Sequence, residues 1–179
     1  MRRASLPLLA GALLLTGCDR PPPEQEARSI DADNPLELAA RERGVVRPDA
    51  AEPTGVFERA HELGRDALCV VPDGAGRWRF AVSAAFGTGF SCRASGSVAR
   101  EGDGWRFTFA GVEDCSVVLR EEEDELRLPG SLPSQCDSLC PGRASLAGLR
   151  LPRASWSVAD AKRLQMRDEE GNNTRPCAD

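Results

Sequence analysis

This sequence contains no tyrosine, one histidine (His61) and one lysine (Lys162). A His-Glu-x-x-His zinc motif is excluded, because Arg65 stands where the second histidine would be needed. The absence of Gly-x-Ser-x-Gly excludes the nucleophile elbow of an α/β-hydrolase. Since Cys-x-x-Cys is also absent, neither a thioredoxin-like motif nor a c-type haem attachment is expected. We therefore predict no catalytic residue, no metal ligand and no cofactor.

Basic residues are outnumbered, with 23 Lys and Arg against 28 Asp and Glu, which gives a net charge of −5. The chain from Cys18 onward loses Arg2 and Arg3 and carries 21 − 28 = −7. An acidic chain without a basic cluster is a poor partner for nucleic acid. Long apolar runs are missing too. Residues Leu6 to Leu15 are ten in number, too short to cross about 30 Å of hydrocarbon as a helix.

That short run fits the apolar core of an export signal, preceded by the positive residues Arg2 and Arg3. It ends in Leu15-Thr16-Gly17-Cys18, which resembles the lipobox of bacterial lipoproteins. The resemblance covers residues 1–19. It implies that residues 1–17 are a cleaved signal peptide and that Cys18 carries the lipid. The domain would then be anchored to a cell membrane and face the periplasm, and Asp19 favours the inner membrane. An ordinary secretory signal is the alternative.

Residues 18–33 hold three successive prolines and several charges, which indicates an extended tether. With Cys18 lipidated, six of the seven cysteines remain. An even number in an oxidising compartment predicts up to three disulfides. The pairing stays open among 15 possibilities, and the cysteines are Cys69, Cys92, Cys115, Cys136, Cys140 and Cys177. The alternative is a zinc site built on Cys136 and Cys140, completed by Cys177 or His61.

Residues 34–179 are predicted to form a single domain. A short helix is expected from Asn34 to Gly44, and a second from the cap Thr54 through Leu63. From Ala67 onward apolar residues alternate along segments separated by turn residues, which predicts antiparallel strands. Further strands follow, the last at 144–151, and a closing helix runs from Ser157 to Gly171. The fold class is mainly β (α+β): an antiparallel meander or small barrel of about six to eight strands, stapled by disulfides, with short flanking helices.

Three features of the strands are candidates for binding. Arg77, Arg79 and Arg106 alternate with Trp78 and Trp105, so they share the face opposite to those rings and could recognise an anionic glycan or a partner's carboxylates. The tryptophans are expected in the core, with a sugar cleft as the alternative. The acidic run at residues 121–125 is interpreted as a solvated hairpin tip, with a cation site or a basic partner as the alternative.

These features predict an envelope lipoprotein with a non-catalytic binding or inhibitor-like domain. Its partner would be an envelope protein or a cell-wall glycan. An envelope hydrolase with a carboxylate pair and a structural envelope protein are the alternatives. In architecture the predicted domain resembles the membrane-bound lysozyme inhibitors, which are small disulfide-bonded β-barrels that follow a lipobox. This chain lacks their inhibitory loop motif and has no tyrosine. The resemblance therefore implies only the size of the domain and its location in the cell envelope.

Overall fold

The computed structural model describes residues 35–42, 52–87, 89–168 and 170–178. The predicted signal peptide, Cys18, Asp19 and the tether lie outside the described residues. Within those ranges, no helix has both the length and the apolar character that crossing a membrane would require.

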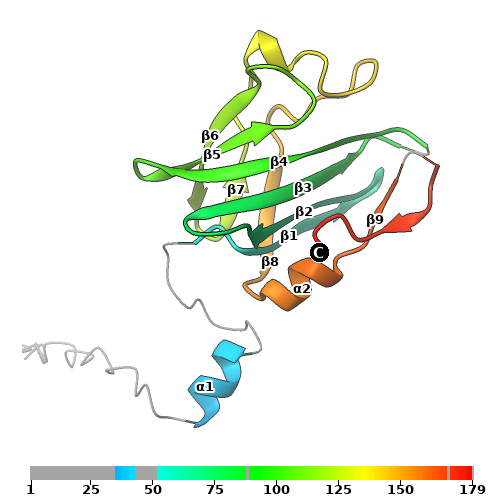
Figure 1. The fold of residues 1–179 in the computed structure, drawn as a ribbon. Coiled ribbons are helices and arrows are strands. Elements are labelled where there is room, and N and C mark those ends of the chain that lie inside the picture. The colour runs from blue at the N-terminus through cyan, green and yellow to red at the C-terminus, as the bar shows by residue number, and fades with distance from the viewer. Residues whose placement is uncertain (1–34, 43–51, 88, 169, 179) are drawn as a thin grey trace, which may run out of the picture. The chain divides into compact units, whose positions relative to one another are not determined.

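The domain is a closed antiparallel barrel in which β1 to β8 pair in sequence order and β8 pairs back with β1 (Figure 1). This confirms the predicted fold class. The strands are β1 (Gly55–His61), β2 (Gly64–Pro72), β3 (Arg77–Ala85), β4 (Ser91–Glu101), β5 (Gly104–Phe109), β6 (Ser116–Glu122), β7 (Glu125–Arg127) and β8 (Arg150–Ser155). The remaining elements are α1 (Pro35–Glu42), a 3-10 turn η1 (Ser134–Cys136), α2 (Val158–Arg163), and a two-stranded hairpin of β9 (Met166–Arg167) and β10 (Asn173–Thr174).

Side chains fill the inside of the barrel. The alternation predicted from the sequence is confirmed, because the inward set on every strand from β1 to β8 is buried in one cluster. Trp78 and Trp105 meet edge to face, with ring centroids 5.1 Å apart. Phe80 contacts Phe107 and Phe109 in the same manner. The two tryptophans therefore belong to the packed core, as expected, and do not line a sugar cleft.

The helix predicted from Thr54 to Leu63 is wrong: this segment is the strand β1. Val56 and Phe57 are both buried, which two successive residues achieve when they point to opposite faces of a strand. β1 pairs with β2 along its whole length and with β8 at its start. The segment was ambiguous because Phe57 and Ala60 have helical spacing, but Ala60 is exposed. Barrel closure, a long-range interaction, overrides the local preference.

Two boundaries near the C-terminal end also differ from the prediction. The strand expected at 144–151 begins at Arg150, and the preceding loop buries Leu146 and Leu149 without strand pairing. The helix begins as predicted, since the Ser157 hydroxyl accepts a hydrogen bond from the Asp160 N–H. It ends at Arg163 and not at Gly171, because the following residues leave the helix and form the β9–β10 hairpin.

Three disulfides join the six cysteines, which confirms the predicted framework. The pairs are Cys69–Cys177, Cys92–Cys140 and Cys115–Cys136. Cys136 and Cys140 thus have disulfide partners, and the zinc alternative is wrong. The second and third bridges fix the loop between β7 and β8 (yellow in Figure 1), which packs Leu146 and Leu149 against the barrel core.

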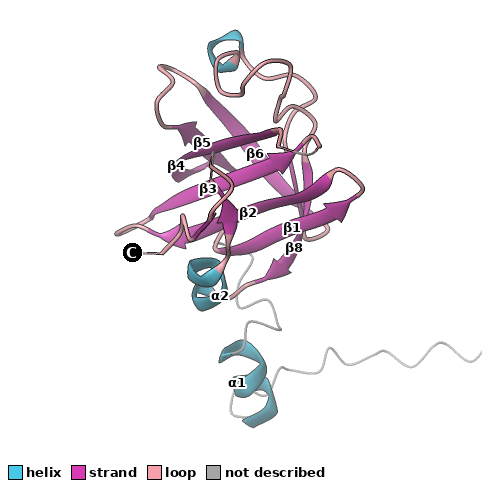
Figure 2. Ribbon diagram, turned by 90° about the vertical axis from the view of Figure 1, so that its right-hand side faces the viewer, coloured by secondary structure: helices cyan, strands magenta, loops and turns pink. Residues whose placement is uncertain are grey.

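A second, smaller core lies on the outer face of the barrel. It gathers the outward residues of β1 to β3 and residues of the C-terminal segment, namely Val56, Ala67, Cys69, Val71, Ala81, Ala161, Met166 and Cys177. Figure 2 shows α2 beside this part of the barrel. Arg79 donates hydrogen bonds to the carbonyls of Pro176, Cys177 and Ala178. The Cys69–Cys177 bridge and Arg79 together hold the last residues against the sheet.

The start of α2 makes a pH-dependent contribution to stability. The Ser155 hydroxyl, and then the Arg163 guanidinium, lower the pKa of Asp160 below its ordinary value of 3.8. The ionised carboxylate therefore stabilises the folded state above that value, and the stabilisation is lost as the pH falls through the folded-state pKa. We expect Asp160→Asn to cost on the order of 0.5 to 1 kcal/mol at neutral pH, because the carboxylate is 38% exposed and screened.

Thermal unfolding of the wild type and of Asp160→Asn between neutral and acidic pH checks this prediction. The difference in Tm should close as the pH falls below 3.8. A difference that stays constant into acid would contradict the assigned role of the carboxylate.

Candidate functional site

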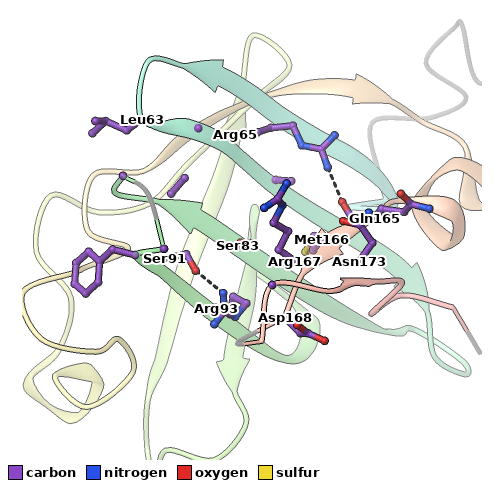
Figure 3. Close-up of a pocket in the computed structure, with 17 residues that line it drawn as sticks. Leu63, Arg65, Ser83, Ser91, Arg93, Gln165, Met166, Arg167, Asp168 and Asn173 are labelled. Carbon is purple, nitrogen blue, oxygen red and sulfur yellow. Dashed lines mark hydrogen bonds between the residues drawn. The ribbon is translucent and has the colours of Figure 1, made fainter.

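A groove of about 600 Å³ lies on the outer wall of the barrel, between the sheet and the β9–β10 hairpin. Its floor comes from β2, β3 and β4, and its far wall from residues 165–168, 171 and 173 (Figure 3). The volume falls within the range of small-molecule sites. Since the inside of the barrel is filled by its core, this outer hollow is the candidate site.

The floor is shallow because the sheet presents small side chains there. Ala67 pairs in register with Ser83, and Ser83 with Arg93, so these three residues form one row across β2, β3 and β4. At Gly64 a Cβ atom would come within 2.7 Å of the Ala85 Cβ, and the φ of +143° also disfavours other residues. Small residues along the sheet thus leave the space that the groove occupies.

Three arginines from three different strands line this hollow. Arg65 extends from β2 and donates to the Gln165 carbonyl oxygen at 2.5 Å, which links the floor to the far wall. Arg93 on β4 donates to the Ser91 hydroxyl. Arg167 stands on β9, and Figure 3 places it between the other two. Three guanidinium groups around one cavity create a positive site on an acidic protein.

One acidic side chain, Asp168, also lines the groove. Its Oδ1 accepts the backbone N–H of Asn172 at 2.7 Å, and its Oδ2 accepts the Asn172 Nδ2 at 3.3 Å. The carboxylate therefore holds the turn between β9 and β10. Arg93 and Arg167 form no ion pair within residues 52–87, 89–168 and 170–178.

Two large apolar side chains also line the groove. Phe90 is 39% exposed and Leu63 is 57% exposed, although both are large and hydrophobic. Phe90 contacts Phe86 at a centroid distance of 6.1 Å. The groove lining therefore includes both apolar side chains and guanidinium groups.

The arginines singled out in the sequence lie elsewhere on the outer wall. Arg77 and Arg106 are both in register with Ala99, so they lie in one row across β3 to β5. Arg106 donates hydrogen bonds to the Glu101 carboxylate and to the Ser116 hydroxyl. Arg79 donates to a backbone carbonyl oxygen of the C-terminal segment. Binding of a partner by this row stays a prediction. The sequence pattern missed Arg65, Arg93 and Arg167, because no local signal reports that β9 folds back over β2 to β4.

The acidic run at residues 121–125 forms the tight β6–β7 hairpin, as the solvated-tip interpretation predicted. Glu123 and Asp124 take positive φ values of 52° and 59°, which suit a two-residue hairpin turn. Glu122 and Glu125 pair with Arg127. These acids therefore have intramolecular partners.

Glu121 differs from its neighbours because its side chain is only 9% exposed. Its two carboxylate oxygens accept hydrogen bonds from Arg153, whose side chain is 1% exposed. Arg153 also donates to the Thr54 carbonyl and lies over the Phe57 and Trp156 rings, at 4.1 and 3.5 Å from their centroids. This buried ion pair was not predicted. The available signal was the position of Arg153 two residues after Leu151, on the inward side of β8.

The single histidine takes part in a structural cluster. His61 Nε2 lies 3.0 Å from Asp66 Oδ1, and Arg59 donates to Asp66 Oδ2 at 3.0 Å. Asp66 is buried and its Oδ1 also accepts the Ala85 N–H at 2.9 Å. The cluster thus ties the β1–β2 hairpin to the end of β3, beside the groove. Within the described part of the chain, no group of three or more His, Cys, Asp or Glu residues is arranged to hold a metal ion.

Comparisons with protein families, curated proteins and solved structures find no match for this chain. The function of the site is therefore inferred from the chemistry and geometry of its own residues.

Proposed function

We propose that this chain is a membrane-anchored envelope lipoprotein whose barrel is a non-catalytic binding module, with the outer groove as its binding site. The groove carries the proposal: it is a hollow with three arginines, two of which have no acidic partner within the described ranges. Guanidinium groups left without carboxylates are suited to bind an external anion.

Two further features support the envelope location. The residues Leu15 to Cys18 resemble a lipobox. All six other cysteines lie in disulfides, which persist in oxidising compartments outside the cytoplasm. A lipid on Cys18 would supply the membrane affinity, at about 0.8 kcal/mol for each buried methylene.

Capture of an envelope component by the full chain tests the binding module. The chain is purified in detergent, incubated with envelope extract and recovered, next to a variant with Arg93→Gln and Arg167→Gln. Stoichiometric capture that the variant loses supports the proposal. Cleavage of muropeptides or esters by the wild type, abolished by acidic-residue substitutions, would replace it with a hydrolase.

The anchor has its own measurement. The intact mass of the purified N-terminus should show a chain that starts at Cys18 with a diacylglycerol and an acyl group. An unmodified Cys18, or cleavage at another residue, would remove the membrane anchor from the proposal.

A further inference from the structure

We infer that the groove binds a carboxylate-bearing oligosaccharide, held through its carboxylates by Arg93 and Arg167, with Arg65 at the edge. This inference rests on the proposed function and specifies the ligand of the same site.

The charge of the groove is opposite to that of the chain. The whole sequence carries −5, whereas three arginines and one aspartate line the groove. Elsewhere on the barrel, exposed arginines pair with acids, as Arg120 does with Asp103 and Arg106 with Glu101. In the described part of this acid-rich chain, Arg93 and Arg167 have no carboxylate partner. Their positive charge therefore remains available to a ligand in the groove.

The shape favours a short glycan segment over the surface of a folded protein. Stable protein interfaces bury about 800 Å² on each partner and are broad. This site is a hollow of about 600 Å³ between a sheet and a two-stranded hairpin. A concave site of this size can accommodate a ligand of a few sugar rings.

The lining offers the contacts that sugars need. Ser83, Ser91 and Asn173 supply hydroxyl and amide groups for ligand hydroxyls. The exposed Phe90 ring in the lining offers an apolar face to a sugar ring. Guanidinium groups bond carboxylates through two parallel N–H donors, so the charged positions along the glycan would fix its register.

The groove is held open before any ligand arrives. Met166 is 6% exposed and anchors the β9 wall in the outer core. The Arg65 bond to the Gln165 carbonyl joins that wall to β2, and the Cys69–Cys177 bridge holds the segment that follows β10. A preformed site avoids the entropic cost of ordering its walls on binding.

Calorimetric titration of the full chain in detergent tests the inference. The probes are trigalacturonate, neutral maltotriose and sulfated maltotriose. We expect trigalacturonate to bind with an affinity that weakens as salt is raised, and maltotriose not to bind. Substituting both Arg93→Gln and Arg167→Gln should weaken binding by about tenfold or more, because charge-assisted contacts are lost.

The matched control is the double substitution Arg120→Gln and Arg150→Gln, which removes the same charge from exposed positions outside the groove lining. It should change the affinity by less than about twofold. A second variant, Ser83→Glu, adds a negative charge to the floor while keeping every arginine, and should also weaken binding by about tenfold or more. Unchanged thermal unfolding of each variant shows that the fold is retained.

Several outcomes would overturn the inference: no binding of trigalacturonate at millimolar concentration, equal loss in the groove variant and the control, or preference for the sulfated probe. If envelope capture persists while trigalacturonate fails to bind, the binding module stands and the carboxylated glycan is excluded. If both fail, the proposed function falls as well.

Discussion

Replacing Cys69 and Cys177 together by alanine is expected to lower the free energy of unfolding by about 4 to 5 kcal/mol. The two residues are 108 positions apart, so the bridge closes the longest of the three loops and restricts the unfolded chain most. It also holds the outer core, where both cysteines are fully buried. Since a domain of this size is stabilised by about 5 to 15 kcal/mol, the variant should be only marginally folded.

Urea unfolding of the oxidised proteins measures this effect. The matched control replaces Cys115 and Cys136, whose loop spans 21 positions, and should cost about 3 kcal/mol. Both variants remove two buried sulfur atoms, so the difference reports the loop length. Equal losses, or a larger loss in the control, would contradict the prediction. Hydrogen exchange should increase in the β9–β10 hairpin of the first variant.

The second large effect is expected at Arg153. The substitution Arg153→Met should cost about 3 to 5 kcal/mol, because it leaves the carboxylate of Glu121 buried without its partner. The Glu121 side chain is 9% exposed and accepts two hydrogen bonds from Arg153. Methionine can still fill the space between the Phe57 and Trp156 rings, so the loss reports the charge more than the packing.

A double-mutant cycle separates the contribution of the ion pair from that of side-chain packing. The double variant Arg153→Met and Glu121→Met should recover most of the loss, since no unpaired charge remains. The control is Arg120→Met, whose side chain is 64% exposed and pairs with Asp103 on the surface. It should cost less than about 1 kcal/mol. A loss of that size at Arg153 would show that its ion pair contributes no more than a surface pair.

Much of the barrel could be predicted because strand parity is a local property. The alternation around Trp105 and Phe107 fixes which side chains face the core, and the Gly102–Asp103 turn fixes the hairpin between β4 and β5. Cys92 and Cys115 follow the same parity and are fully buried. Their partners could not be predicted, because the connectivity depends on how the loop between β7 and β8 folds back over the barrel.

The errors and omissions concern long-range contacts. Residues 54–63 resemble a capped helix locally, and the pairing of β1 with β8 makes them a strand. Arg153 appears as one polar residue in a short strand until closure brings it to Glu121. The groove needs β9 to fold back over β2 and β4, and it joins Arg93 to Arg167 across 167 − 93 = 74 positions of the sequence. No sequence pattern therefore indicates that Arg93 and Arg167 line the same groove.

The order of the disulfides along the chain has a consequence for how the protein matures. The three bridges are nested: Cys115–Cys136 lies within Cys92–Cys140, which lies within Cys69–Cys177. An oxidant that joins cysteines in the order of their emergence would form Cys69–Cys92, Cys115–Cys136 and Cys140–Cys177. Only the middle bridge of that set is native.

The native set therefore requires thiol–disulfide exchange after the first bridges form, or oxidation delayed until the barrel has closed. Cells that lack a disulfide isomerase should accumulate chains with the consecutive pairing, which non-reducing peptide mapping would detect. Because Cys177 lies near the C-terminal end, the most stabilising bridge is also the last that can form during synthesis.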